Sequence, residues 1–565
     1  MKQPNPAIVA QTAVQRLPSW ALVSICIIYI VTGLINRDPW KVLDISSFGY
    51  MWALAQGYTD LWHLELAGMT PDIQGPLAYA LGGVFISLLG GWLTPDTAVR
   101  VPFMACLLIT FVATWHAIYF LAKNPHAQPV VFAFGGEAHP EDYAKAIADA
   151  GLLALIACLG MALPSHETTP LAVQLCSMAV FFCGVAMLRT HGLIAVGLVD
   201  LALLSLGLSG APFVALILST GAVFLSFKQE DKRFVHIVLL IGGCLSLLIL
   251  VSWADLWKWE ILTAEDAISR WQGLIRLLLW FTWPAWPLAA WTLWTWRKQW
   301  EEHIWEQHLV LPVFLWFVVF IASISSKNPE RTLLLSLPAL ACMAAFALPT
   351  LKRSIAALID WFTLLFFTGG AVIIWVVWLS LQTGFPSQPA INVSRLAPGY
   401  ISTLEWGSTC IAFIVSAMWG KLILWRLGRH PRFIWKSLVL PASGAVLCWV
   451  LLMTLWMPLL NYARSYKPLA LQVKQLVGDP NCVFSLGLNR AQIAGLSFHA
   501  NLKIISHQKN QTQACTWLIT HPQAIDTQVT NLEPALWEKI KVIRRPSDKR
   551  EDIVLYKLIV NSRNE

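Results

Sequence analysis

Long apolar runs separated by short polar segments repeat along most of the chain. The runs 22–35, 101–122, 171–188 and 438–460 contain no Asp, Glu, Lys or Arg. As helices rising about 1.5 Å per residue, such runs approach or cross a hydrocarbon layer about 30 Å thick. Isolated strands would leave backbone groups unpaired in lipid, so the pattern predicts an all-α polytopic membrane protein.

Basic clusters recur after alternate apolar runs, and the positive-inside rule places them on the cytoplasmic side. The clusters are Lys228/Lys232/Arg233, Arg297/Lys298, Lys352/Arg353 and Arg426/Arg429/Arg432/Lys436. This regularity predicts a cytoplasmic N-terminus, an external C-terminus and about thirteen transmembrane helices. The predicted spans are 20–36, 98–121, 147–163, 170–188, 193–208, 211–227, 234–252, 273–296, 309–325, 332–350, 354–382, 401–425 and 437–460.

The apolar stretch 77–93 is short and Gly-rich, and we expect it to lie at the interface or re-enter rather than cross. The transmembrane domain is then 1–460, with a first outer loop at 37–97. The remaining 461–565 alternates apolar and polar segments, which predicts a soluble α/β domain. Its expected strands are 482–488, 502–506, 515–520, 541–543 and 553–559, and its expected helices are 467–476 and 532–540.

Composition supports the membrane prediction, because 57% of the residues are hydrophobic and only 13% are charged. The formal charge of +8 resides in clusters between spans, so the positive-inside rule accounts for it and nucleic acid is not expected as a partner. The eleven cysteines show no zinc-binding spacing. Cys482 and Cys515 lie on expected strands of the tail, and they form a disulfide if the tail faces an oxidising compartment.

The most informative candidate residue is Asp44, which follows the first span. The periodicity after it predicts a helix with Asp44 at the N-cap and Phe48, Met51 and Trp52 on one apolar face. Asp44 would then lie at the membrane surface on a rigid helix. Arg37 and Lys41 lie at the end of the span, where snorkelling to the interface accounts for them.

The order of features around Asp44 resembles the GT-C class of membrane glycosyltransferases, in particular the aminoarabinose transferase and protein mannosyltransferase group. Asp44 matches the first residue of an Asp-Glu pair, Ile45 replaces the Glu, and Gln74-Gly-Pro76 stands where a double proline is usual. Arg100 matches an Arg that opens the second span. The family resemblance extends to Ser165-His166-Glu167 in the second outer loop and to Ser325-Ser-Lys327-Asn-Pro-Glu-Arg331 in a later one.

The resemblance implies transfer of a sugar from a polyprenyl-phosphate donor to a lipid, glycan or protein acceptor at the outer face of a bacterial inner membrane. Such transfer needs a base for the acceptor's proton and cations for the departing phosphate. Asp44 is the expected base, and Lys41, Arg100, Lys327 and Arg331 are the expected phosphate ligands, with His166 and Glu167 contributed by the second outer loop. A divalent metal is the alternative to these cations, and His63, Glu65, His166 and Glu167 are its candidate ligands.

Two other functions stay open. A lipid or solute transporter should carry ionisable residues at mid-span or repeated halves, and here Asp200 is the clear mid-span case. A non-catalytic family member is the other alternative. It is suggested by Ile45 in place of the Glu and by Leu208-Ser-Gly210, where a Thr-Lys-Gly lysine is usual.

Overall fold

The computed structural model describes residues 5–227, 234–257, 271–302, 306–326, 329–428, 433–506, 515–522, 537–545 and 547–559. The chain forms two compact units. The first, called the helical unit here, comprises Met1–Ile35, Phe103–Ile374 and Gly407–Thr454. The second, called the loop–tail unit, comprises Asn36–Pro102, Trp375–Trp406 and Leu455–Glu565.

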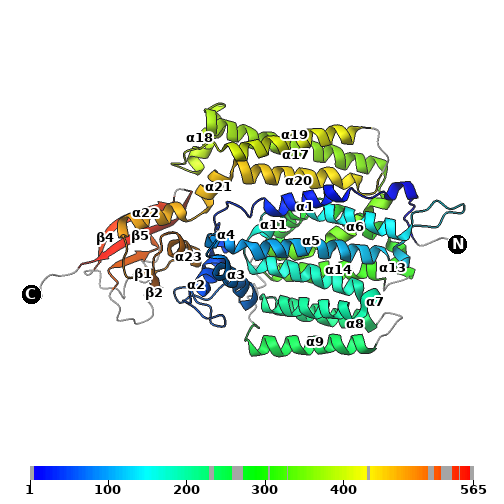
Figure 1. The fold of residues 1–565 in the computed structure, drawn as a ribbon, viewed down its shortest axis with the longest axis horizontal. Coiled ribbons are helices and arrows are strands. Elements are labelled where there is room, and N and C mark those ends of the chain that lie inside the picture. The colour runs from blue at the N-terminus through cyan, green and yellow to red at the C-terminus, as the bar shows by residue number, and fades with distance from the viewer. Residues whose placement is uncertain are drawn as a thin grey trace, which may run out of the picture. The chain divides into compact units, whose positions relative to one another are not determined.

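The helical unit is built from apolar helices whose long members run along one common direction (Figure 1). Its elements, including helices that extend past the unit boundary, are η1 Gln11–Val14, α1 Ser19–Val31, α5 Arg100–Ala122, η2 Pro125–Ala127, α6 Pro140–Ala157, η3 Pro164–His166, α7 Pro170–Leu208, α8 Pro212–Phe227, α9 Phe234–Trp253, α11 Trp271–Phe281, α12 Ala285–Thr295, α13 Arg297–Glu302, α14 Gln307–Ser325, α15 Pro329–Leu333, η4 Leu334–Ser336, α16 Leu337–Ala347, η5 Leu348–Thr350, α17 Arg353–Thr383, α19 Trp406–Leu427 and α20 Lys436–Leu455.

Nine helical segments of the described chain are long and apolar enough to cross a membrane. This confirms a polytopic helical protein, while the count of thirteen spans stays a prediction. The segment α7 consists of two helices that meet at a kink at His191 and Gly192, where the backbone angles are non-helical. The sequence predicted a break between two spans at this position. The predicted span 273–296 is divided into α11 and α12.

Small residues allow the helices of this unit to pack closely. Every residue of α16 is buried, and this helix packs against α6 and α12. A Cβ atom on Gly151 of α6 would lie 2.3 Å from the end of the Ile118 side chain, which would have to move to make room. Close approach through small residues is the usual way in which membrane helices associate, because lipid offers no hydrophobic drive between them.

The loop–tail unit combines the first outer loop with the C-terminal tail. Its elements are α2 Leu43–Ala55, α3 Pro76–Leu89, α4 Pro95–Ala98, α18 Ser387–Leu396, α21 Met457–Arg464, α22 Lys467–Val477, β1 Val483–Leu486, α23 Arg490–His499, β2 Ile504–Ser506, β3 Trp517–Thr520, β4 Trp537–Arg545 and β5 Asp548–Leu558. Helix α3 has 14 residues, fewer than the roughly 20 that span a bilayer. It packs on α2, where a Cβ on Gly82 would lie 2.3 Å from the Met51 sulfur.

The tail folds into a five-stranded mixed sheet of order β2-β1-β3-β5-β4. Strand β1 is parallel to β2 and β3, with Val483 opposite Ile504 and Trp517, and β5 is antiparallel to β3 and β4. The small α/β tail was therefore predicted correctly, but 537–540 belongs to strand β4 and not to the predicted helix 532–540. Residues 532–536 lie outside the described residues. The division into domains at 460/461 stays a prediction.

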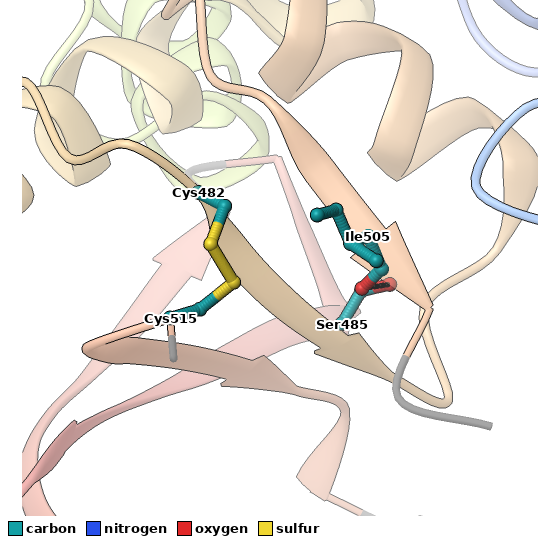
Figure 2. The surroundings of a disulfide bond; sticks show 4 residues. All are labelled: Cys482, Ser485, Ile505 and Cys515. Carbon is teal, nitrogen blue, oxygen red and sulfur yellow. Dashed lines mark hydrogen bonds between the residues drawn. A yellow bond between two sulfur atoms is a disulfide. The ribbon is translucent and has the colours of Figure 1, made fainter. Parts of the chain in front are cut away.

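A disulfide joins Cys482 and Cys515, which precede the neighbouring parallel strands β1 and β3 (Figure 2). Their Cα atoms are 5.2 Å apart, and 33 residues separate them in sequence. Beside this bond the Ser485 hydroxyl donates to the Ile505 carbonyl oxygen at 3.3 Å and so ties β1 to β2. The disulfide is the pairing that was expected for a tail in an oxidising compartment.

Replacing both Cys482 and Cys515 by Ser should lower the free energy of unfolding of the tail by about 3–4 kcal/mol, because the unfolded chain regains the entropy of an open loop. Hydrogen exchange of the β1 and β3 amides in the full-length protein measures this loss. Cys410→Ser, which changes an exposed free cysteine, is the matched control and should have no effect. Equal protection in the double variant and the wild type would contradict the prediction.

Acid should weaken the attachment of α23. Burial lowers the pKa of His499 to about 4, while Asp38 and Asp96 act in the opposite direction. In the unfolded chain His499 becomes protonated below about pH 6.5, whereas in the folded protein it becomes protonated only near pH 4. The free energy that protects the α23 amides from exchange should therefore decrease as the pH is lowered from about 6.5 to about 4. The decrease should be smaller in His499→Gln. His63→Gln, at an exposed site in the same unit, should keep the wild-type slope.

Candidate functional site

A buried ion pair lies at the start of the first outer loop. Arg37 Nη2 is 2.7 Å from Asp44 Oδ2, and both side chains are almost completely buried. Asp44 Oδ2 also accepts the backbone N–H of Trp40 at 3.2 Å. Two further donors of Arg37, Nε and Nη1, are buried without a hydrogen-bond partner among the residues that the structure describes. Nε and Nη1 of Arg37 are therefore placed to donate to a further anion.

Asp44 is the second residue of α2 and does not cap it, which corrects the N-cap prediction. The N-cap position is Val42, whose side chain makes no capping hydrogen bond. The Ile45 backbone N–H instead bonds to the Trp40 carbonyl oxygen at 3.0 Å, so the loop itself closes the first turn. A carboxylate in the first turn is still favoured by the helix dipole. Asp44 is buried and paired with Arg37, whereas the side chain of an ordinary N-cap residue faces water.

Trp40 and the first helix of the tail hold the Arg37 loop in place. The Trp40 indole N–H donates to Asn461 Oδ1 at 2.9 Å, and the Asp38 backbone N–H donates to the same oxygen at 3.1 Å. The Asn461 amide donates in turn to the Asn36 carbonyl oxygen at 3.0 Å. The Arg37 guanidinium lies 4.6 Å from the Trp40 ring centre. Asn461 thus ties α21 to both sides of the loop that carries Arg37.

Arg100 adds a second buried guanidinium to this cluster. Its side chain is 2% exposed, at the start of α5 in the loop–tail unit. It lies within electrostatic range of Arg37, which repels it, and of Asp44, which attracts it. Asp96 and Asp38 attract Arg100 as well, so the cluster combines two buried guanidiniums with three carboxylates, of which Asp44 is the buried one. The structure therefore places Asp44 and Arg100, two candidate residues from the sequence, in one cluster with Arg37, which sequence reasoning had assigned only to snorkelling.

Lys41 is already neutralised by the tail. Its Nζ lies 2.5 Å from Asp548 Oδ2 and 3.9 Å from Glu551 Oε1, both in β5. Its backbone N–H donates to the Arg464 carbonyl oxygen at 3.0 Å. Lys41 therefore links the outer loop to the sheet, and phosphate binding by Lys41 stays a prediction.

In the helical unit, the second outer loop forms another ion pair. Glu167 Oε1 lies 3.1 Å from Arg331 Nη2, and the Glu167 side chain is buried. The structure thus brings two predicted site residues together, although they are far apart in sequence. Lys327 lies outside the described residues.

The candidate metal ligands do not fit a metal site. His166 is fully buried; its Nδ1 faces the Ala162 carbonyl oxygen at 2.5 Å and its Nε2 faces the Tyr29 carbonyl oxygen at 2.8 Å, so both nitrogens are engaged. His63 and Glu65 are exposed in the loop–tail unit. Within the described parts of the chain, no group of three or more His, Cys, Asp or Glu side chains is placed to hold a metal ion.

Arg331→Met should destabilise the helical unit by roughly 3–5 kcal/mol, because it leaves the Glu167 carboxylate buried without its guanidinium. Adding Glu167→Gln should restore much of this loss, since the buried charge disappears as well. Thermal unfolding of the purified protein in detergent compares these variants. Lys352→Met removes an exposed cation of the same unit and should be neutral. Additive effects of the two site substitutions would argue against the pair.

Comparison with known proteins shows the fold. No protein-family model and no curated protein matches the chain. The crystal structure of ArnT from Cupriavidus metallidurans in the apo state aligns over 95% of this chain and 97% of that one, with a TM-score of 0.59 and 14% identity. ArnT from the same organism bound to undecaprenyl phosphate aligns over the same shares, at a TM-score of 0.59 and 13% identity. An oligosaccharyltransferase from Archaeoglobus fulgidus aligns at a TM-score of only 0.38, with 10% identity, over 87% of this chain and 65% of that one.

The chain therefore has an ArnT-like GT-C fold, a helical membrane region with a small C-terminal sheet. This confirms the fold class that the sequence predicted. The structural alignment with the two ArnT structures establishes the fold. At 14% and 13% sequence identity it does not assign roles to residues of this chain.

Proposed function

We propose that this protein is an integral membrane glycosyltransferase that moves a sugar from a polyprenyl-phosphate donor to an extracytoplasmic lipid, glycan or protein acceptor. We further propose a bacterial inner-membrane location, with the N-terminus cytoplasmic and the tail periplasmic. The fold is shared with ArnT, one structure of which has undecaprenyl phosphate bound. The observation that carries the proposal is the buried cluster of Asp44, Arg37 and Arg100, which places a carboxylate beside guanidinium groups.

The chemistry requires these two kinds of group. The bond between the sugar's anomeric carbon and the phosphate oxygen breaks, and a bond from that carbon to the acceptor oxygen or nitrogen forms. The acceptor loses a proton, which Asp44 takes, and the lipid phosphate leaves with the electrons of the broken bond. A guanidinium suits the departing phosphate because its planar fork of N–H donors matches phosphate oxygens.

The Arg37–Asp44 ion pair would link removal of the acceptor's proton to departure of the lipid phosphate. The carboxylate that would take the proton lies 2.7 Å from the Arg37 guanidinium. When Asp44 takes the proton, Arg37 loses its counter-charge at the moment when the phosphate gains charge. The guanidinium, with Nε and Nη1 unpartnered among the described residues, is then the nearby cation for that phosphate. Asp44 and Arg37 thus act as a unit.

Asp44→Asn should reduce transfer by roughly 10²–10⁴-fold, the usual contribution of a positioned general base. The measurement is transfer of radiolabelled sugar from polyprenyl phosphate into lipid, glycan and protein fractions by protein reconstituted in liposomes. Arg37→Lys keeps the charge but loses the fork, and it should reduce transfer less than Arg37→Gln does. The labelled fraction identifies the acceptor.

Asp60→Asn is the matched control, because it makes the same change at an exposed position of the same loop. It should transfer sugar like the wild type. Equal transfer by Asp44→Asn and Asp60→Asn would remove Asp44 as the base. Absence of transfer by the folded wild type across several sugar donors would instead favour the transporter or the non-catalytic alternative.

A further inference from the structure

A cavity of about 720 Å³ lies within the helical unit, among the N-terminal segment and helices α17, α19 and α20. Apolar side chains form much of its wall, including Ile8, Trp361, Leu364, Ile423 and Leu440. None of the residues considered for sugar transfer lines it. A cavity with such walls accepts an apolar chain more readily than a fully hydrated solute.

The lining of this cavity is also basic. Arg353, Arg426 and Lys436 line it together with a single carboxylate, Asp360. Arg426 pairs with Asp360, and the lining as a whole has three cations to one carboxylate. Lys436 is only 6% exposed, and its ammonium lies 5.6 Å from the Trp425 ring centre. The cavity therefore combines apolar walls with a net positive charge, the combination that an anionic amphiphile requires.

The Asp360–Arg426 pair is incompletely satisfied. Arg426 Nε and Asp360 Oδ1 are buried and have no hydrogen-bond partner among the described residues. An unsatisfied buried donor is costly, and a ligand oxygen placed beside Arg426 would remove that cost. A glycerol hydroxyl of the same ligand could donate to the remaining Asp360 oxygen. The pair thus suits a head group that carries both a phosphate and hydroxyls.

The three cations lie at or near the ends of their helices. Arg353 begins α17, Arg426 lies in the last turn of α19, and Lys436 begins α20. Asp360 comes two turns into α17, which corresponds to about 10 Å along the helix axis. The basic clusters at this end of the helices are predicted to face the cytoplasm. Basic pockets between spans on that side are suited to anionic lipid head groups.

We propose that this cavity binds one anionic glycerophospholipid from the cytoplasmic leaflet. Its phosphate lies against Arg353, Arg426 and Lys436, and an acyl chain follows the wall formed by Trp361, Leu364 and Leu440. This site is separate from the proposed sugar-transfer residues and does not depend on the proposed function. Its role is that of a bound structural or regulatory lipid at the predicted cytoplasmic face.

The test is native mass spectrometry of the full-length protein, delipidated in a non-ionic detergent and titrated with phosphatidylglycerol, phosphatidylcholine or glycerol 3-phosphate. One phosphatidylglycerol molecule should bind more tightly than phosphatidylcholine or glycerol 3-phosphate. Arg353→Gln should weaken phosphatidylglycerol binding about fivefold, the value of one cation near a membrane surface. The double variant Asp360→Asn/Arg426→Gln removes the pair without leaving an orphan charge, and it should also weaken binding.

Lys352→Gln is the matched control, because Lys352 neighbours Arg353 and is exposed but does not line the cavity. It should bind phosphatidylglycerol like the wild type. An equal loss in Lys352→Gln and Arg353→Gln would overturn the proposal in favour of general surface charge. Equal affinity for phosphatidylcholine would overturn it too, and glycerol 3-phosphate binding as tightly as the lipid would make the ligand a soluble phosphate.

Discussion

Charges buried in this chain must be compensated, and the Arg37–Asp44 pair in the loop–tail unit shows the constraint at its most severe. Removing two ions from water costs several kcal/mol each, which only a close partner and further hydrogen bonds repay. The Trp40 backbone N–H supplies one such bond, and Asn461 fixes the loop on which Arg37 lies. The tail's first helix is therefore part of the structure that holds the candidate base.

Most of the fold could be predicted because a helix that crosses lipid must be apolar and long enough to span it, and both properties can be read from the sequence. The tail was harder, since short amphipathic segments suit a strand and a helix about equally well. Residues 537–540 were included in the predicted helix 532–540, but they belong to strand β4, which pairs with β5. Helix α23 went unpredicted, although Asn489 and Gln492 form a capping box whose spacing is visible in the sequence.

The candidate site was only partly predictable. Asp44 was found through its position after the first span, but its partner Arg37 was read as a snorkelling cation. Nothing in a spacing of seven residues across a non-helical loop signals that the two side chains meet. Lys41 shows the converse, because the Asp548 carboxylate that neutralises it lies more than five hundred residues away in sequence. Pairings of this kind arise from tertiary structure and leave no local pattern.

Among the described residues, arginine forms the ion pairs with the least exposed side chains: Arg37–Asp44, Arg331–Glu167, Arg426–Asp360 and Arg545–Glu551. Pairs with an exposed carboxylate use either cation, as in Lys123–Glu141, Lys474–Asp479 and Arg490–Asp72. A guanidinium is more weakly hydrated than an ammonium and offers five donors in a fixed fork. Arg37 can therefore hold Asp44 through Nη2 and still present Nε and Nη1 to a second anion. A lysine in its place would have to divide one small charge between both partners.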